Sequence, residues 1–467
     1  MPLDDIHYQP LTTVAKHIAS GELSPVDVTR AILTRIEALD PGLKSYVTVT
    51  ADLALSQART AEAEIMKGNY RSPMHGIPIA VKDLCFTKGI KTTGGMTIHA
   101  DFIPTHDATV VTKLAQAGAI LLGKLRMTEG ATLEHHPDLP EPVNPWKANL
   151  WTGVSSSGSG VATAAGLAYA TIGSDTGGSI RFPAACNGLT GVKPTWGRIS
   201  RYGIFDLAAT FDHLGPMARS AGDAAAMLQS LAGWDPNDST SLSTPVPNYL
   251  AELEGIYGAR GVRIGLDWEY AGADADPVTI GVIKDAVAVL AGIGALPREV
   301  AFPPVDALLR HTMAMTMVEM AAHHERTYPS HAEKYGTWIK TGMEIGRSAS
   351  SLEIGKGIIE RYKFRGAVIR MFNDIDVLVM PVFRTGTPTW EEVREAVAND
   401  FNIIGKFTSP FNATGTPTVT LPCGYTDDGR PVGFQLAGAH GSEALLLRVA
   451  HAYQQATDWH IRRPPGY

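Results

Sequence analysis

Residues 173–188 read GSDTGGSIRFPAACNG, and this stretch carries most of the information about the chain. Pro183 suits the first turn of a short helix and Gly188 can end it, so Ser179 is predicted to lie just before a helix. The nearby backbone amides can then converge on one point; they belong to Thr176, Gly177, Gly178 and Ser179. Converging amides of this kind stabilise an oxyanion. The stretch therefore predicts a serine nucleophile beside an oxyanion hole.

A second run of small residues, GVSSSGSG, occupies positions 153–160. It leads into a stretch of Ala, Gly, Thr and Val from about Ser159 to Tyr169, which we interpret as a helix. Glycine and serine permit unusual backbone conformations, and amides are exposed at the start of a helix. Small residues dominate the whole of 150–200, so we expect its backbone to pack closely against other backbone or against a ligand.

Lys82 follows a predicted strand in which the apolar residues Ile77, Ile79 and Val81 alternate. Burial in such a strand lowers the pKa of a lysine, and a neutral lysine can act as a base. The alternative is a structural ion pair between Lys82 and Asp83. No histidine lies near the serines in the sequence, so a Ser–Lys arrangement is favoured over a Ser-His-Asp triad.

The remainder of the chain predicts one α/β unit. In residues 10–66 we expect helices, one of them capped by Ser24 with Pro25 at its first position. From residue 76 short apolar runs alternate with helices, which is typical of α/β folds. Further on, we expect strands at 374–381, 416–422 and 431–438 and a helix at 442–456. The predicted divisions are N-terminal helices (1–66), a core (67–225), a helical insertion that forms the substrate pocket (226–372) and the rest of the core (373–467).

The composition disfavours several classes of protein. The 467 residues contain 40 Lys and Arg against 47 Asp and Glu, a net charge of −7 without any basic run, which disfavours nucleic acid as a partner. Cys85, Cys186 and Cys423 are too far apart for a metal or redox pair, and so few cysteines fit a reducing compartment. The N-terminus does not resemble a signal peptide, and the apolar runs are too short to span a membrane. We therefore expect a cytoplasmic protein that binds neither nucleic acid nor membrane.

Two further motifs are interpreted as structural. GAILLGKL at 118–125 has the spacing of a phosphate-binding loop, but Leu125 stands where a hydroxyl would bind magnesium. Glu319 and His323 are one helical turn apart and could bind a metal, but a solvated helix face is the favoured interpretation. Accordingly, we expect no metal and no cofactor.

Residues 153–195, with GSDTGGSIRFPAA at their centre, resemble the amidase signature family. The resemblance covers most of the chain, including IPIAVKD at 77–83, FDHLGPMARS at 211–220 and PFNATGTPTVTLPCG at 410–424, and is weaker between about 230 and 370. It implies a single α/β domain in which helices cover both faces of a central, mixed, twisted sheet. It also implies a hydrolase of linear amides, with carbamates or esters as further substrates.

The resemblance further implies a Ser–cis-Ser–Lys triad. The nucleophile falls on Ser179 and the base on Lys82. The bridging serine of the family lies 24 residues before the nucleophile, which selects Ser155, and it follows a cis peptide bond. This chain has GVSSSGS where the family usually has GGSSGGS. Val154 should therefore have a negative φ.

Two glycines bear on the class of substrate. An alternative within the same family is the glutaminase subunit of a tRNA-dependent amidotransferase, which must bind both charged ends of glutamine. The charged positions of such subunits align with Gly405 and Gly342, so we expect a neutral amide or carbamate. A catalytically inactive binding module is disfavoured because the triad is intact. We expect a monomer or homodimer, with substrate contacts from Ala131, Leu133 and Phe205 and an apolar lining completed by Phe211, Trp338 and the methionines Met313, Met315, Met317 and Met320.

Overall fold

The computed structural model describes residues 5–255, 257–400 and 402–467, and within them eleven strands form one mixed sheet in the order β1-β3-β2-β4-β6-β5-β10-β11-β9-β7-β8. The strands are β1 (Tyr46–Val49), β2 (Pro78–Lys82), β3 (Ile120–Leu125), β4 (Ala170–Asp175), β5 (Thr190–Lys193), β6 (His213–Ala218), β7 (Arg263–Leu266), β8 (Leu296–Glu299), β9 (Val377–Pro381), β10 (Thr418–Tyr425) and β11 (Pro431–Gly438).

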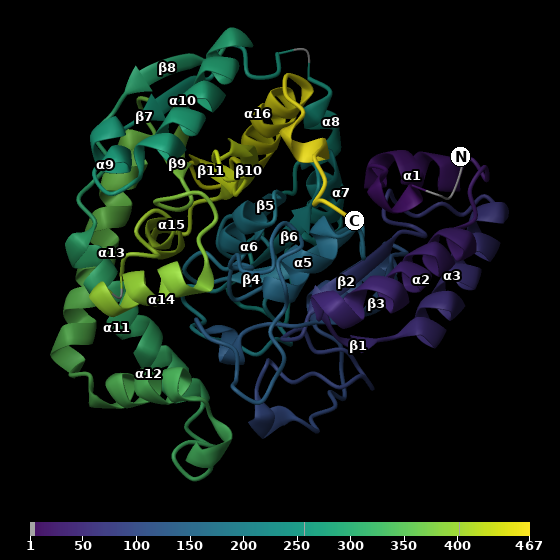
Figure 1. The fold of residues 1–467 in the computed structure, drawn as a ribbon, viewed down its shortest axis with the longest axis horizontal. Coiled ribbons are helices and arrows are strands. Elements are labelled where there is room, and N and C mark those ends of the chain that lie inside the picture. Colours follow the sequence, from purple (N-terminus) through teal and green to yellow (C-terminus); the bar gives the residue numbers. More distant parts are fainter. Residues whose placement is uncertain (1–4, 256, 401) are drawn as a thin grey trace.

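Helices lie around this sheet (Figure 1). They are α1 (Leu11–Ala19), α2 (Pro25–Leu43), α3 (Ala51–Met66), α4 (Thr109–Gln116), α5 (Ser157–Ala164), α6 (Arg181–Cys186), α7 (Ala221–Leu231), α8 (Tyr249–Leu253), α9 (Trp268–Gly272), α10 (Pro277–Gly292), α11 (Asp306–His323), α12 (Thr337–Ser348), α13 (Ser351–Met371), α14 (Trp390–Asn399), α15 (Ser409–Thr414) and α16 (Glu443–Gln455). Short 3₁₀ helices are η1 (Ile6–Tyr8), η2 (Thr97–His99), η3 (Glu129–Ala131), η4 (Ala332–Lys334) and η5 (Trp459–Ile461).

Helices cover both faces of the central strands. Neighbouring residues of a strand point to opposite faces of its sheet. On β11, Gly433 lies against Ala185 of α6, whereas the ring of Phe434 contacts Tyr453 of α16. The predicted α/β architecture, a mixed sheet with helices on both faces, is therefore confirmed.

The local signals at the first long helix are also confirmed. The Ser24 side chain accepts hydrogen bonds from the amides of Val26 and Asp27, and Pro25 is the first residue of α2. The buried face of α2 includes Val28, Ile32 and Ile36, the predicted apolar stripe. Such a cap contributes about 1 kcal/mol to the stability of a helix.

The structure corrects the predicted divisions in three places: two segments predicted as helical contain strands, and one predicted boundary lies within a helix. Residues 1–66 are not all helical, because β1 lies between α2 and α3 and pairs with β3. Residues 226–372 are not purely helical either, since β7 and β8 extend the sheet at its far edge. The four residues of β8 are all exposed, so no apolar pattern marks them. The predicted boundary at 225/226 falls inside α7.

Residues 151–176 are all buried, and their backbone packs closely, as the small-residue composition predicted. A Cβ atom at Gly158 would lie 2.5 Å from the carbonyl oxygen of Ser45, and one at Gly153 would lie 2.4 Å from the nitrogen of Pro183. The helix predicted from about Ser159 to Tyr169 is shorter than expected: α5 ends at Ala164. Gly166, with a φ of 70°, then turns the chain toward β4.

No helix in the described part of the chain is both long and apolar enough to cross a bilayer.

Candidate active site

Lys82 lies at the end of β2 and is fully buried. Its Nζ is 2.7 Å from the Oγ of Ser155, 2.8 Å from that of Ser174 and 3.0 Å from that of Ser156. All four side chains are thus part of one buried cluster, which we call the lysine–serine cluster. The predicted contact between Lys82 and Ser155 is present in the structure.

Strand pairing brings these residues together. β2 and β4 are parallel neighbours, with Ile79 opposite Ala170, so their carboxyl ends meet at one edge of the sheet. Lys82 ends β2, and Ser174 is the penultimate residue of β4. Ser155 and Ser156 approach from the loop before α5.

The loop that carries Ser155 has the backbone that the family resemblance implied. The peptide bond between Val154 and Ser155 is cis. Gly153 has a φ of 74°, a conformation that favours glycine, whereas Val154 is not among the described residues with positive φ. The valine that replaces the family glycine is therefore compatible with this loop.

Burial lowers the pKa of Lys82 to about 7, although the carboxyl groups of Asp212 and Asp175 oppose the shift. Burial likewise raises the pKa of Asp212 to about 7, and Asp206 adds to that increase. A substantial fraction of Lys82 is therefore neutral near neutral pH. A neutral amine can accept a hydrogen bond from a hydroxyl, which an ammonium cannot do.

The alternative interpretation, an ion pair between Lys82 and Asp83, is absent from the described residues. Asp83 instead pairs with Lys124, whose Nζ is 3.6 Å from Asp83 Oδ1, and accepts hydrogen bonds from the amide and hydroxyl of Thr93. The structural alternative for Lys82 is therefore wrong.

Ser179 lies two residues before α6, as predicted. The start of α6 is held by Asp175, which forms a bidentate pair with Arg181 at 2.9 and 3.0 Å and accepts a hydrogen bond from the amide of Ile180 at 3.1 Å. Burial opposes ionisation of Asp175, but the Arg181 guanidinium outweighs it and holds the pKa of that carboxyl below its usual range. This buried pair fixes the turn that presents Ser179.

The backbone amides of residues 176–179 were predicted to form an oxyanion hole. Within the described residues, none of these four amides donates a hydrogen bond to the protein, although the following amide, that of Ile180, is bonded to Asp175. The turn is braced by other contacts: the Thr176 hydroxyl donates to Asp212, and the Gly177 carbonyl accepts from Thr408. Gly178 has a φ of 143°, and a Cβ there would lie 2.4 Å from the ring of Phe182. This arrangement is compatible with the predicted oxyanion hole of Thr176, Gly177 and Gly178.

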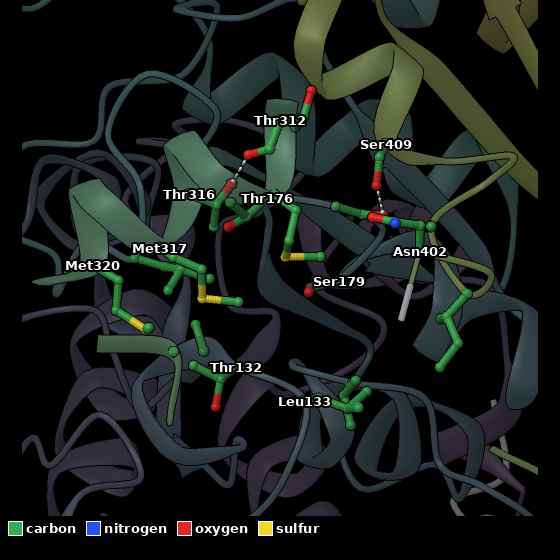
Figure 2. Close-up of a pocket in the computed structure, with 18 of the residues that line it drawn as sticks. Thr132, Leu133, Thr176, Ser179, Thr312, Thr316, Met317, Met320, Asn402 and Ser409 are labelled. Atoms are coloured by element: carbon green, nitrogen blue, oxygen red, sulfur yellow. Dashed lines mark hydrogen bonds between the residues drawn. The ribbon is translucent and has the colours of Figure 1, made fainter. Parts of the chain in front are cut away.

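Ser179 opens onto a cavity of about 160 Å³. Figure 2 shows Ser179 near the middle of this cavity, with Met317 and Met320 on one side and Leu133 and Asn402 on the other. None of the described residues that line the cavity is charged; they are Ala131, Thr132, Leu133, Val154, Thr176, Gly177, Ser179, Phe182, Leu207, Leu309, Thr312, Met313, Thr316, Met317, Met320, Trp338, Gly342, Val397, Asn402, Ile404, Gly405 and Ser409. The wall from 226–372 comes from α11 and α12.

The predicted pocket residues are only partly correct. Ala131 and Leu133 line the cavity, and Ala131 has a φ of 62°, which is unusual for a residue other than glycine. Phe205 does not line it: its ring packs against His99, Phe86 and Phe102.

Phe211 and Met315 were also predicted to line the cavity, and neither does. Phe211 is fully buried with the Arg361 guanidinium 4.2 Å from its ring centroid. Met315 lies on a different face of α11 from Met313, Met317 and Met320, and it lines a separate cavity. The sequence marks these side chains as apolar but does not indicate which face of the helix meets the cavity.

The structure adds three candidate site residues that the sequence did not indicate: Ser156, Ser174 and Asn402. Ser156 and Ser174 both contact Lys82, and the Ser156 hydroxyl also bonds to the backbone of Ser174. Asn402 lies in the cavity wall. Ser174 could have been suspected because it belongs to the GSDTGG motif, but only the pairing of β2 with β4 brings it to Lys82.

No group of three or more His, Cys, Asp or Glu side chains among the described residues has the arrangement of a metal site. Glu319, which is one helical turn from His323, accepts hydrogen bonds from the amide and hydroxyl of Thr210.

Comparison with known proteins gives consistent results. The family described as Amidase matches residues 27–447. The chain is 45% identical to "Putative amidase AmiD" of Mycobacterium tuberculosis, over 99% of this chain and 97% of that protein. It is 39% identical to a glutamyl-tRNA(Gln) amidotransferase subunit of Azotobacter vinelandii, over 99% of this chain and 100% of that one. Among solved structures, the peptide amidase of Stenotrophomonas maltophilia matches with a TM-score of 0.83 at 30% identity, over 100% of both chains.

Proposed function

Because the chain belongs to the amidase family, and is thus an enzyme of amide hydrolysis, we propose that it cleaves a neutral carboxylic amide or carbamate through an acyl-enzyme on Ser179. The observation that carries this proposal is the lysine–serine cluster: a buried lysine surrounded by hydroxyl groups, next to the turn that bears Ser179.

In the proposed first step, neutral Lys82 accepts the proton of Ser155, and Ser155 accepts the proton of Ser179. The Ser179 Oγ forms a bond to the substrate carbonyl carbon, and the carbonyl oxygen becomes an oxyanion. When the C–N bond breaks, the proton returns through Ser155 to the leaving nitrogen. The amine departs, Lys82 is neutral again, and Ser179 carries the acyl group.

In the second step water attacks the acyl group and gives its proton to the same relay. The Ser179–acyl bond breaks, Ser179 regains a proton, and a carboxylic acid leaves. The free amides at 176–179 supply hydrogen bonds to the oxyanion in both steps. Each donor of this kind contributes about 3 kcal/mol to the stability of a transition state.

The cavity supports a neutral substrate. Gly342 and Gly405, the positions aligned with the charged residues of glutaminase subunits, both line it. A Cβ at Gly342 would lie 2.5 Å from Met320 Cε and 2.7 Å from Met317 Sδ, so the wall is closely packed there. A zwitterion would be desolvated without charged partners, whereas an apolar group gains about 25 cal/mol per Å² buried.

A second candidate is the glutaminase subunit of an amidotransferase. It is favoured by the 39% identity to the glutamyl-tRNA(Gln) amidotransferase subunit of Azotobacter vinelandii over essentially the whole of both chains. The uncharged cavity weighs against it. A direct competition separates the two: glutamine against a neutral p-nitroanilide and an aryl carbamate, with the purified chain alone. A higher kcat/KM for glutamine would select the glutaminase.

The nucleophile is tested by covalent labelling. A fluorophosphonate should modify Ser179, as located by mass spectrometry after digestion. Ser179→Ala should abolish both labelling and hydrolysis, and Ser157→Ala serves as the matched control from the neighbouring serine run. An adduct on Ser156 or Ser157 in the unaltered enzyme would contradict the assignment.

We further propose that residues 1–467 act as one catalytic unit, as a monomer or homodimer in the cytoplasm, without nucleic acid. The three cysteines are free and buried, which fits a reducing compartment. Sedimentation of the purified chain tests the oligomeric state.

A further inference from the structure

Helix α13 has two unlike faces. One face packs against the protein through Gly357, Phe364, Val368 and Met371. On the other, large apolar side chains are exposed to solvent: Leu352 by 67%, Ile359 by 56%, Tyr362 by 68% and Ile369 by 48%. Exposed apolar surface concentrated on one element is typical of an interaction site. The helix runs along the outer edge of the molecule, on the side opposite α1–α3 (Figure 1).

The spacing of these exposed residues is that of a coiled coil. Leu352, Ile359 and Gly366 occupy the first positions of a seven-residue repeat, and Gly355, Tyr362 and Ile369 occupy its fourth positions. We call these six residues the α13 seam. A Cβ at Gly355 would meet nothing within 4 Å, and one at Gly366 would meet only the end of the Arg370 side chain. The protein itself leaves this seam uncovered within the described residues.

A row of positive charge runs beside the seam. Lys356, Lys363 and Arg370 recur every seven residues, each directly after a seam position, and all three are exposed. The opposite flank carries Ile358 and Arg365. In coiled coils, the charged residues beside the apolar seam determine which partner helix is accepted. The positions directly beside the seam contain no acidic residue, whereas Glu353 and Glu360 lie one position further from it.

We propose that α13 is a docking site for an amphipathic helix of another protein, one with an apolar seam flanked by acidic residues. Such a helix would cover the exposed side chains and place carboxylates beside Lys356, Lys363 and Arg370. This proposal goes beyond the amidase activity and does not depend on it.

Two other occupants fit less well. A second copy of this chain would bring α13 against α13, and neither an antiparallel nor a parallel pair then sets an acidic residue beside the basic row. Gly355 and Gly366 add no apolar side chain that could insert into a lipid surface. In a seam between two helices, by contrast, small residues let the partner helix approach closely.

The test uses the full chain and two synthetic, fluorescein-labelled peptides of three heptads. Both have Leu and Ile in the seam positions; one has Glu on both flanks, and the other has Lys. Like charges on their flanks keep each peptide from pairing with itself. Fluorescence anisotropy should show that the Glu-flanked peptide binds, and that its affinity is about tenfold or more above that of the Lys-flanked peptide.

Variants then test the two parts of the surface separately. The triple variant Lys356→Glu/Lys363→Glu/Arg370→Glu should reverse the preference between the peptides. Ile359→Ser/Tyr362→Ser should weaken binding of the Glu-flanked peptide about tenfold or more. Ile103→Ser/Ile461→Ser, which alters exposed apolar residues elsewhere, is the matched control and should bind as the unaltered chain does. Circular dichroism melts establish that each variant is folded.

Several results would overturn the proposal. The first is no binding of the Glu-flanked peptide at 200 μM, or equal binding of the two peptides. The second is a dimer in sedimentation that Ile359→Ser/Tyr362→Ser dissociates, which would assign the seam to a second copy. The third is seam-dependent binding to phosphatidylserine vesicles, which would assign it to a lipid surface.

Discussion

Two neighbouring strands, β2 and β3, each place a buried lysine near their carboxyl ends, and the two lysines have different surroundings. Lys124 on β3 lies 3.6 Å from the carboxylate of Asp83 and donates to the hydroxyl of Thr92 and to the carbonyl of Cys85. Lys82 on β2 contacts three serine hydroxyls and, within the described residues, no carboxylate.

This difference shows how similar burial can serve two purposes. A carboxylate and a carbonyl can only accept hydrogen bonds, so they favour the ammonium form of Lys124. A hydroxyl can also donate, so the partners of Lys82 suit the neutral amine as well. Burial lowers the pKa of both lysines, but Asp83 directly opposes that shift at Lys124. Lys124 is thus suited to structure and Lys82 to proton transfer.

The largest expected effect is the loss of Lys82. Lys82→Met removes the proposed base while leaving an apolar chain of similar length in the cluster. Because the members of a nucleophile–base unit act together, kcat/KM should fall about ten-thousand-fold or more. The measurement is hydrolysis of a p-nitroanilide, with the rate of fluorophosphonate labelling as a second readout. Activity near that of the unaltered enzyme would remove Lys82 from the mechanism.

The next effect, at Lys124, should concern stability rather than activity. Lys124→Met leaves Asp83 buried without its cation, which costs about 3–5 kcal/mol of unfolding free energy. Denaturant unfolding measures this loss, and labelling per folded molecule should stay close to that of the unaltered enzyme. In the double variant Lys124→Met/Asp83→Leu the loss should be smaller than in the single variant. A Lys124→Met enzyme that is stable but inactive would contradict the division of roles.

The sequence could predict Lys82, Ser155 and Ser179 as the candidate triad because each lies in a continuous, recognisable motif. Their roles stay predictions, although the contact between Lys82 and Ser155 and the cis bond before Ser155 are present. Ser174 could not be chosen from sequence, because its place beside Lys82 depends on the parallel pairing of β2 with β4.

The wrong prediction for Phe205 and the missed strand β8 have similar physical causes. Phe205 is aromatic and close to the motif, but an aromatic side chain can pack in a cluster as readily as in a cavity, and here it contacts Phe86 and His99. β8 is a short, exposed edge strand of sequence LPRE, so it has no alternation of apolar residues to detect. Both depend on tertiary neighbours that local patterns do not contain.

A carboxylate placed beside Lys82 should make that lysine behave more like Lys124. In the unaltered enzyme, kcat/KM should rise tenfold per pH unit below about pH 7 and then level off, because only neutral Lys82 is active and its pKa is about 7. Ser174→Asp should raise the pKa of Lys82 by about 1–3 units, since a nearby negative charge favours the ammonium. The pH profile should shift upward accordingly, and activity at pH 7 should fall.

The control for that shift is Ser174→Asn, which has nearly the same shape without the charge. Its pH midpoint should stay close to that of the unaltered enzyme. Equal midpoints for the Asp and Asn variants would show that the charge beside Lys82 does not govern activity.

The smallest expected effect is that of removing a single hydroxyl, in Ser174→Ala. Lys82 keeps its contacts with Ser155 and Ser156, so the base is present but one of its three hydrogen bonds is lost. A hydrogen bond of this kind is worth about 1 kcal/mol, which corresponds to a decrease of about fivefold in kcat/KM. If Ser174 only positions Lys82, kcat should fall while KM for a p-nitroanilide is unchanged, because Ser174 does not line the cavity. Ser174→Thr keeps the hydroxyl and should recover most of the rate, whereas a loss as large as that of Lys82→Met would mean that Ser174, rather than Ser155, carries the proton from Ser179.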